Sequence, residues 1–475
     1  MGHRSTADHM RGVLGNDQVR DGTAVERVYA CDSYSIERHE PECVVFPRNT
    51  YETQLAVQRC IEIDVPFTAR GAGTGLSGGV TAVKGGVIVS TKRMNQILEV
   101  DPVNRCTLVQ AGVVNQKVNN AVKPFGLMFA PDPSSQTVCT IGGNINENSG
   151  GPHTLKYGVT ADHVLQATLV DSRAQVIVAG SRVSGGPGID PLSLVVGSEG
   201  TLGIVTEAWL RLVPMPERIE TALIAFSTIR SAVDAVVEVM ARGVIPAALE
   251  MMDKHVLSAV EKAFGLDYPK GSEALLLIEC DGRSQQAESE IRSAIEACLD
   301  CGATNVETAG NEEDRKRLWT ARKKGIGAMG RLAPTIVTHD GVIPRSRLPE
   351  MLEFVYAIAE ENSLGVANIF HAGDGNLHPC FYFDEREPGT VERVLAAGEA
   401  VLDKCVELGG SVTGEHGIGL EKIDSWSKSL SANDLRLQTT VREAFDVSGL
   451  CNPCKVIPNQ KGCVEHRRRW SGAAT

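Results

Sequence analysis

The chain has 475 residues, of which 42% are hydrophobic and 22% are charged, so it is long enough to bury the cores of two or three globular domains. Its 47 Lys and Arg residues against 59 Asp and Glu residues give a formal charge of -12, which disfavours unspecific attraction to nucleic acid or anionic lipid. No apolar run approaches the roughly 20 residues that span a bilayer, and the N-terminus lacks the apolar core of a signal peptide, so we expect no transmembrane segment and a cytoplasmic protein.

The first half of the chain has the pattern of short strands separated by glycine-rich turns. Residues 1–39 are expected to form an N-terminal helical or extended segment. After it, β-rich runs predict strands at 65–70, 85–91, 107–113, 164–170 and 175–180. The Pro214-Met215-Pro216 spacing suits a domain edge, so we predict a strand-dominated domain over residues 40–217.

The second half alternates between helical and strand periodicity. Strands are predicted at 222–227 and 274–280, and helices at 230–242, 284–300 and 312–330. Further strands near 335–343 and 366–383 flank a predicted helix at 346–361. This alternation predicts an α+β domain over residues 218–440, with ferredoxin-like elements and helices packed on an antiparallel or mixed sheet.

A glycine-rich loop follows the first of these predicted strands and consists of Arg70, Gly71, Ala72, Gly73, Thr74 and Gly75. Glycines let backbone N–H groups close around a phosphate, so the loop is either a pyrophosphate site or a cluster of structural turns. The spacing Gly73-x-Gly75-x-x-Gly78 formally matches the dinucleotide fingerprint, but a strand and not a helix is predicted to follow, which argues against a Rossmann fold.

Three further segments combine small or hydroxylated residues with exposed backbone, at 130–135, 141–151 and 197–205. In order and spacing, the four segments resemble the FAD-binding domain of the vanillyl-alcohol oxidase/p-cresol methylhydroxylase superfamily. Over residues 40–460 the chain resembles the flavoprotein subunit of bacterial glycolate oxidase and the related D-lactate dehydrogenases. This resemblance implies a two-part FAD-binding domain and a substrate-binding cap domain. It also implies that residues 441–460 return to the FAD domain, and residues 461–475 are expected to be a disordered tail.

The resemblance implies a set of FAD-binding residues. These are Arg70, Gly71, Ala72, Gly73, Thr74 and Gly75 at the diphosphate, then Pro131, Asp132, Ser134, Ser135, Gly142, Gly143, Asn144, Asn148, Gly150, Gly203, Ile204 and Asn452 along the rest of the cofactor. Relatives with covalent flavin often carry a histidine where this chain has Thr74, which implies non-covalent FAD. Turn capping by a short polar side chain remains the alternative for Asp132 and Asn148.

Two glycine-framed loops carry a histidine and carboxylate constellation, at residues 368–379 and 413–419. Two histidines, one glutamate and an open position make a catalytic divalent-metal set, whereas each histidine taken alone is as well explained as a hydrogen-bonded loop residue. In the resembled family, His371, His378 and Glu415 match the ligands of zinc or manganese, and His416 matches the active-site base. Asn376 resembles a substrate-facing donor.

Arg322 lies in a basic run of a predicted helix, where composition alone favours a solvated face. The resemblance aligns it with the arginine that grips the substrate carboxylate, for which a planar guanidinium is suited.

The 13 cysteines show no compact framework of spacings, so we expect mostly free thiols. Cys298-x-x-Cys301 and Cys451-x-x-Cys454 each have a metal or redox spacing. A single pair of cysteines is weak evidence for such a site, so we expect these four residues to be thiols in the core. Relatives commonly carry a glycine in place of Cys454.

These features predict FAD-dependent oxidation of a small D-2-hydroxy acid, glycolate or D-lactate, with hydride transfer to flavin N5, a divalent metal and a histidine base. The alternatives are a larger acid such as D-2-hydroxyglutarate, a non-catalytic FAD-binding subunit, and a metal hydrolase without flavin. No haem or iron–sulfur spacing is present, so the resemblance implies an electron-accepting partner: an iron–sulfur subunit, a cytochrome or a quinone. Such partners would allow a location peripheral to the inner membrane, and a homodimer remains open.

Overall fold

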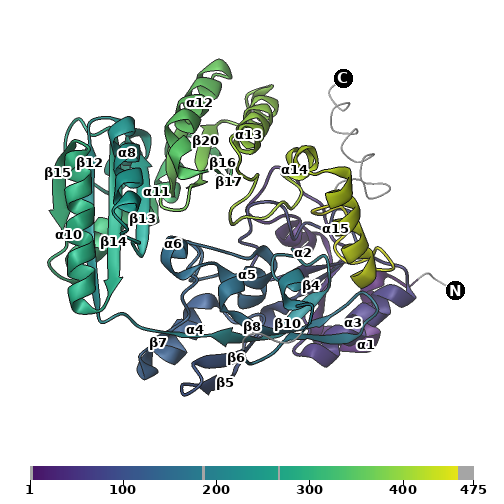
Figure 1. Ribbon diagram of the computed structural model, residues 1–475. Coiled ribbons are helices and arrows are strands. Elements are labelled where there is room, and N and C mark those ends of the chain that lie inside the picture. Colours follow the sequence, from purple (N-terminus) through teal and green to yellow (C-terminus); the bar gives the residue numbers. More distant parts are fainter. Residues whose placement is uncertain (1–3, 184–187, 266–267, 458–475) are drawn as a thin grey trace.

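The computed structural model describes residues 4–183, 188–265 and 268–457, which are built around three multi-stranded sheets (Figure 1). The first two sheets and the third lie in separate regions of the molecule, with the residues after about 410 lying over the first two. The sheets differ in strand direction, and this difference follows from how their strands are connected.

The first sheet has four strands in the order β1-β2-β4-β3. Its strands are β1 (Val19–Arg20), β2 (Cys43–Val45), β3 (Phe67–Arg70) and β4 (Val87–Ser90). Strands β2 and β3 each pair with β4 in parallel, because helix α3 (Thr50–Glu62) crosses over between β2 and β3. Asn49 caps α3 by accepting a hydrogen bond from the Glu52 N–H at 2.9 Å.

The second sheet is antiparallel, with five strands in the order β5-β6-β10-β8-β9. They are β5 (Ile97–Asp101), β6 (Cys106–Gln110), β8 (Val164–Val170), β9 (Val176–Gly180) and β10 (Ile204–Arg211). Helices α4 (Asn115–Val122), α5 (Ile141–Glu147) and α7 (Leu192–Val195) pack their apolar residues into the same core as this sheet. A separate ribbon pairs β7 (Leu127–Met128) with β11 (Val213–Pro214).

The third sheet has nine antiparallel strands. They are β12 (Arg218–Phe226), β13 (Ala248–Asp253), β14 (Ala274–Gly282), β15 (Ala303–Thr308), β16 (Thr335–Thr338), β17 (Gly341–Val342), β18 (Gly365–His371), β19 (Asn376–Leu377) and β20 (Pro379–Phe383). The order β15-β12-β14-β13 places the first strand between the fourth and the third, which is the ferredoxin-like arrangement of two β-α-β units.

Helices cover both faces of this sheet, so its strands are nearly continuous hydrophobic runs. One face packs against α8 (Ile229–Ala241), α10 (Ser284–Asp300), α12 (Leu348–Glu361) and α13 (Thr390–Glu407). The other face packs against α9 (Lys254–Phe264) and α11 (Glu312–Met329). In β12, Ile224 points to the first face and Leu223 to the second, as strand alternation requires.

The remaining helices surround these sheets. They are α1 (Thr6–Leu14), α2 (Thr23–Tyr29), α6 (Thr154–Tyr157), α14 (Ile423–Ser429) and α15 (Ala432–Phe445). After α15 the chain returns to the first sheet, where Cys451 forms a parallel bridge with Phe67. The C-terminal segment around Cys451 therefore pairs with the edge of β3, although the two are far apart in the sequence.

The α+β fold with ferredoxin-like elements is confirmed, and the strands predicted in both halves lie close to the observed ones. The prediction of a strand-dominated first half missed α3, α4 and α5, and the second half also contains β13, α9, β15 and α13, which were not predicted. As expected, the chain enters β4 and not a helix after the glycine loop that follows β3. The predicted tail at 461–475 lies outside the described residues.

Eleven cysteines among the described residues are free thiols, as expected, and Cys298 and Cys451 are buried in the core. Cys454 is disulfide-bonded, so the prediction of a free core thiol was wrong for this residue. Cys451 is a free thiol, so the Cys451-x-x-Cys454 spacing does not indicate the state of Cys454, which explains the error. In the part of the chain that the structure describes, no helix combines the length and apolarity needed to cross a membrane.

Candidate active site

The two histidines of the first loop are brought together by a tight turn between β18 and β19. His371 ends β18 and pairs with Asn376 at the start of β19, and His378 directly follows β19. Gly375 has a φ of +80°, and a Cβ there would overlap the Ile343 carbonyl oxygen, so the turn requires glycine. The two imidazole rings lie edge to face with their centroids 5.2 Å apart.

Glu415 of the second loop completes this cluster. Its Oε1 lies 3.4 Å from His371 Nε2 and 3.1 Å from His378 Nε2. The three potential ligand atoms all lie within 4.8 Å of one another. Although burial opposes it, the carboxylates of Glu250 and Glu415 raise the pKa of His371 to about 10. An environment that favours a positive charge at this imidazole also favours a cation beside its Nε2.

Glu250 of β13 is a site residue that the sequence analysis missed. It is fully buried, and its Oε1 lies 2.6 Å from His371 Nδ1. This contact fixes the His371 ring so that Nε2 faces Glu415, as a carboxylate behind a ligating histidine does in metal sites. The only signal in the sequence was a single acidic residue within the apolar run of residues 247–252.

Arg322 of α11 joins the same cluster. Its Nε donates to Glu250 Oε2, and one terminal nitrogen lies 3.5 Å from His371 Nε2. The side chain is 5% exposed, which rules out the solvated basic face that composition alone suggested, whereas the neighbouring Lys323 and Lys324 are exposed. The guanidinium is therefore held at the histidine and carboxylate cluster.

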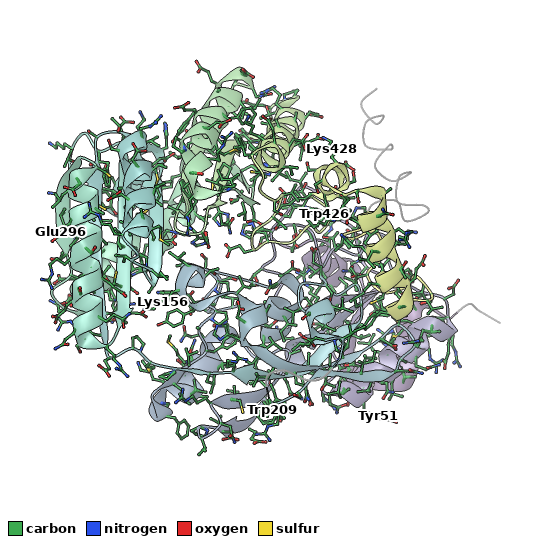
Figure 2. All side chains as sticks on the ribbon, in the orientation of Figure 1. Tyr51, Lys156, Trp209, Glu296, Trp426 and Lys428 are labelled. Carbon is green, nitrogen blue, oxygen red and sulfur yellow. The ribbon has the colours of Figure 1, made fainter. Side chains whose placement is uncertain are left out.

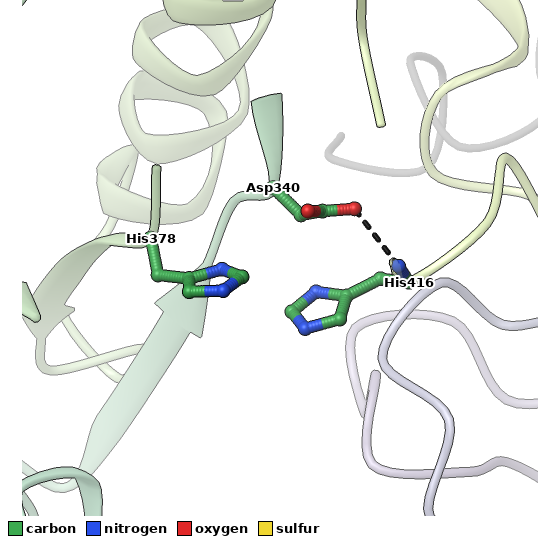
Figure 3. A group of neighbouring side chains, drawn as sticks. All are labelled: Asp340, His378 and His416. Carbon is green, nitrogen blue, oxygen red and sulfur yellow. Dashed lines mark hydrogen bonds between the residues drawn. The ribbon is translucent and has the colours of Figure 1, made fainter. Parts of the chain in front are cut away.

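His416 stacks on His378, with ring centroids 4.9 Å apart (Figure 3). Its Nε2 lies 3.7 Å from Glu415 Oε1, and its Nδ1 has no hydrogen-bond partner among the described residues. Burial and the neighbouring His378 lower the pKa of His416 to about 4, so the imidazole is neutral. Asn376 lies directly beside this loop, since a Cβ on Gly414 would come within 2.6 Å of the Asn376 amide nitrogen.

Asp340, between β16 and β17, was also missed. It is completely buried, and its carboxylate accepts the His416 N–H at 2.9 Å (Figure 3). Asp340, His378 and His416 form a second group with metal-ligand spacing. However, both carboxylate oxygens of Asp340 already accept backbone N–H groups, and Oδ2 also accepts from Lys422 Nζ at 3.1 Å. This leaves the group of His371, His378 and Glu415 as the better cation site.

The predicted phosphate loop lies across a narrow pocket from α5. A Cβ on Gly71 would overlap Thr140 Oγ1, so the backbone there approaches as closely as glycine allows. Arg70 packs over the Tyr29 ring at 5.1 Å and donates to the Cys31 carbonyl at 2.9 Å. The pocket is lined by Ala69, Arg70, Gly71, Gly79, Val80, Thr91, Gly142, Gly143, Asn146, Glu147, Glu199, Gly200 and Val205.

The other residues expected to bind the cofactor are spread around this pocket. Asn144 is buried in α5, and its amide nitrogen has no hydrogen-bond partner among the described residues. Asn452 Nδ2 donates to the carbonyls of Gly79 and Glu199. Ala72, Gly73, Thr74 and Gly75 continue the loop from Gly71, Pro131 is buried, Ser134 is exposed and Ser135 is half-buried.

Several of the expected cofactor residues have a structural role. Asn148 is left-handed at the end of α5 and accepts the Ala161 N–H at 2.8 Å, which is the turn-capping role left open by the sequence. Asp132 pairs with His153 Nδ1 at 2.7 Å. Ile204 is fully buried in the N-terminal core, and a Cβ on Gly203 would lie 2.6 Å from the Val170 carbonyl oxygen.

Gly150, three residues after the end of α5, lies beside the histidine and carboxylate cluster. A Cβ on Gly150 would lie 2.9 Å from Glu415 Oε2. The segment that resembles a flavin-binding loop therefore contacts a member of the proposed metal set, and the two sites predicted separately from the sequence are adjacent in space.

Known protein families match both halves of the chain. Residues 41–180 match the family described as "FAD binding domain", and residues 215–456 match "FAD linked oxidases, C-terminal domain". The chain is 41% identical over 437 residues to the glycolate oxidase subunit GlcD of Escherichia coli (strain K12), covering 92% of this chain and 88% of that protein. It is 35% identical over 449 residues to a D-lactate dehydrogenase of Anaerostipes hadrus, covering 92% and 94%.

Solved structures of lower identity share the fold. The 4-ethylphenol oxidase of Gulosibacter chungangensis superimposes with a TM-score of 0.78 at 18% identity, covering 95% of this chain and 96% of that one. A p-cresol methylhydroxylase superimposes with a TM-score of 0.75 at 16% identity, covering 95% and 96%. These likenesses confirm the type of FAD-binding fold that the glycine-rich segments predicted. The chain therefore belongs to the family of FAD-linked oxidases and is an FAD-binding oxidoreductase.

Proposed function

We propose that this protein oxidises a small D-2-hydroxy acid, glycolate or D-lactate, to the corresponding 2-oxo acid. The observation that carries the proposal is a single cluster in which His371, His378, Glu415, His416 and Arg322 meet beside Gly150 of the FAD-binding part. The relatives named glycolate oxidase subunit and D-lactate dehydrogenase act on acids of this class, which supports the same substrate class here.

The residues present fit both groups that this chemistry needs. The close approach of Gly71 to Thr140 and the buried, unpartnered Asn144 amide suit a cofactor lying between the loop and α5. Two imidazole nitrogens and one carboxylate oxygen are the donor set that zinc or manganese accepts in catalytic sites. When bound, FAD supplies the electron acceptor and the divalent cation supplies a Lewis acid.

The chain's own side chains then bind and deprotonate the substrate. Arg322 is held by Glu250 with a terminal nitrogen turned toward the cluster, so it would bind the substrate carboxylate and fix which C2 hydrogen is presented. His416 is neutral and close to Glu415, so its imidazole would take the hydroxyl proton. Asn376 lies within the same cluster and would donate to a substrate oxygen.

The FAD is proposed to be non-covalent, because Thr74 offers no nucleophile suited to attachment. Acid precipitation should then release the flavin to the supernatant. Electrons are proposed to pass to a partner, either an iron–sulfur subunit, a cytochrome or a quinone, since the sequence carries no haem or iron–sulfur spacing. A location in the cytoplasm or at the inner membrane through such partners belongs to the same proposal.

Anaerobic reduction of the bound flavin tests the substrate class. Glycolate or D-lactate should bleach the flavin absorbance, and L-lactate should not. Reduction by D-2-hydroxyglutarate alone would move the assignment to larger acids, and a colourless purified protein would contradict the proposal altogether. Chelation, or His378→Ala, should abolish the bleaching and leave FAD bound, and unchanged bleaching in metal-free protein would remove the metal from the mechanism.

A further inference from the structure

The loop that carries Glu415 and His416 is held through its backbone by two buried carboxylates. Asp340 accepts the N–H groups of Gly414 at 3.1 Å, Glu415 at 3.2 Å and His416 at 2.9 Å. Glu199 accepts the N–H groups of Ile418 and Gly419, both at 2.6 Å. Between them, Gly417 donates to Thr413 Oγ1 at 3.0 Å. Six successive N–H groups therefore donate to side-chain oxygens.

The two carboxylates belong to different parts of the molecule. Asp340 lies between β16 and β17 and so fixes the loop to the sheet that carries His378. Glu199 lies between α7 and β10 and lines the pocket assigned to FAD. It therefore links the Glu415 and His416 loop to the FAD-binding part, 219 residues away from Ile418 in sequence.

Glu199 is itself held rigidly in an unfavourable conformation. Its φ is +52°, in the left-handed region that side-chain-bearing residues rarely adopt. Its N–H donates to the Asn146 carbonyl at 2.8 Å, and its own carbonyl accepts from Asn452 Nδ2 at 2.8 Å. Strain that persists because neighbours fix it is typical of a residue with a positioning role.

The contact between this loop and Glu199 is as close as the backbone permits. A Cβ on Gly417 would lie 2.9 Å from Glu199 Cδ and 2.5 Å from Glu147 Oε2. Glu199 is 6% exposed, and burying a carboxylate is unfavourable unless hydrogen bonds compensate. The two short bonds from Ile418 and Gly419 supply that compensation, so the carboxylate and the loop stabilise each other.

We propose that Glu199 is a positioning residue that sets the distance between the Glu415 and His416 loop and the FAD pocket. This inference rests on the proposed function, since it assigns Glu199 to the same hydroxy-acid oxidation. Ser77 of the FAD-binding part adds a weaker tie, because its Oγ donates to the His416 carbonyl at 2.9 Å. A displacement of about 1 Å at a reacting group slows catalysis by roughly 10²-fold, so loss of this link should affect the rate more than binding.

Glu199→Gln tests the proposal, because glutamine keeps the shape and one acceptor oxygen but turns an amide NH₂ toward the second N–H. Glu199→Ala removes both acceptors, and if it fails to fold the glutamine variant still decides. Asp171→Asn is the matched control: Asp171 is fully buried in the same part of the chain and its Oδ1 accepts two backbone N–H groups, from Arg173 and Gln175, away from the loop.

Two measurements are needed. In hydrogen–deuterium exchange, the amides of Ile418 and Gly419 should exchange at least about tenfold faster in Glu199→Gln than in wild type or Asp171→Asn. In anaerobic stopped flow with glycolate or D-lactate, flavin reduction in the FAD- and metal-loaded variant should be slower by about 10- to 100-fold, with substrate affinity within a few-fold of wild type.

Faster exchange with an unchanged rate of flavin reduction would overturn the proposal, as would unchanged exchange. Equal slowing in Asp171→Asn would reduce Glu199 to a general stabilising role. If no hydroxy acid reduces wild-type flavin, the proposed function fails, and the catalytic role of Glu199 fails with it even where exchange confirms that the loop is held.

Discussion

At the scale of single residues, the candidate site separates groups that contact the substrate from groups that hold them. His416 belongs to the first kind, because its neutral ring stacks on His378 and its Nε2 faces Glu415. Glu250 and Asp340 belong to the second kind, since each is buried and holds a member of the site: Glu250 holds the His371 ring, and Asp340 accepts the His416 N–H. Substitutions in the two groups should therefore have different signatures.

His416→Ala should retain FAD and metal but slow flavin reduction by roughly 10²- to 10⁴-fold, the range for a positioned acid–base group. Substrate affinity should fall less, because Arg322 remains held by Glu250. Anaerobic stopped flow measures both quantities. His255→Ala, on α9, is a suitable control and should reduce at the wild-type rate. A His416→Ala enzyme reduced within a few-fold of wild type would assign the proton to another group.

Lys455 provides a pH-dependent prediction away from the cluster. It is completely buried, donates to the Thr81 carbonyl at 2.6 Å, and burial lowers its pKa to about 7. In the unfolded chain the pKa of this lysine is near 10.4. Between pH 7 and pH 10 the unfolded state therefore binds more protons than the folded state. Unfolding free energy should therefore rise with pH from 7 toward 10, by up to about 1.4 kcal/mol per pH unit.

Lys455→Met removes the titrating group and should flatten this part of the profile. Urea unfolding midpoints of both proteins at pH 7 and pH 9 give the comparison. An equal rise in both proteins would show that other groups produce the dependence.

The residues that sequence analysis found and those it missed differ in a physical way. Two glycine-framed loops carry His371, His378, Glu415 and His416. Ionisable side chains between glycines stand out in the local sequence, so these residues could be found from it. Glu250 lies 121 residues before His371, in a strand with no turn or repeat to mark it. The partnership between them exists only once β13 and β18 pair, so no local pattern could reveal it.

At the scale of elements, the same contrast explains which parts of the fold could be predicted. The strands of the third sheet are long apolar runs, and helices such as α10 have a clear 3.6-residue period, so both were predicted. Helix α5 is seven residues long and contains Gly142 and Gly143, which normally indicate turns. It forms because Thr140 caps it and because the core buries Ile141 and Ile145.

Gly71→Ala should disrupt this helix and the cofactor pocket together. The added Cβ would overlap Thr140 Oγ1, displacing the side chain that caps α5. Loss of such a cap is destabilising by about 1 kcal/mol, and FAD affinity should fall as well because the loop moves. Flavin fluorescence titration and thermal unfolding of the apoprotein measure the two effects.

Gly12→Ala is the control for this change. Gly12 is exposed on α1 with nothing within 4 Å of an added Cβ, so alanine there should be neutral or stabilise slightly. Unaltered FAD affinity in Gly71→Ala would mean that the loop is a structural turn and not part of the cofactor site.

At the scale of the whole molecule, a buried charge network joins the FAD-binding part to the third sheet. Glu279 of β14 accepts from His153 Nε2 at 3.2 Å, Arg315 Nε at 2.9 Å and Trp319 Nε1 at 2.8 Å. Nearby, Lys156 of α6, which is labelled in Figure 2, donates to Asp281 Oδ1 at 2.6 Å. Burial opposes it, yet the carboxylates of Asp132 and Glu279 raise the pKa of His153 well above its usual value.

Glu279→Ala should therefore destabilise the protein by up to about 3–5 kcal/mol, since it removes the buried carboxylate that His153, Arg315 and Trp319 share. Glu288→Ala is the comparison, because its ion pair with Arg218 is half-exposed and such pairs contribute about 0–1 kcal/mol. Urea unfolding followed by tryptophan fluorescence reports both. Similar losses in the two variants would show that the network does not stabilise the contact between the two parts.

The return of the C-terminal segment has a consequence for the order of events during synthesis. The Asn452 amide donates to the Gly79 carbonyl, which lies 373 residues earlier in the sequence. The same amide nitrogen donates to the Glu199 carbonyl in the same pocket. Ribosomes release the N-terminal residues first, so both glycine-rich loops emerge well before the side chain that ties them together. A nascent chain with only its FAD-binding half exposed thus presents an unfinished pocket, and stable cofactor capture must await the synthesis of Asn452.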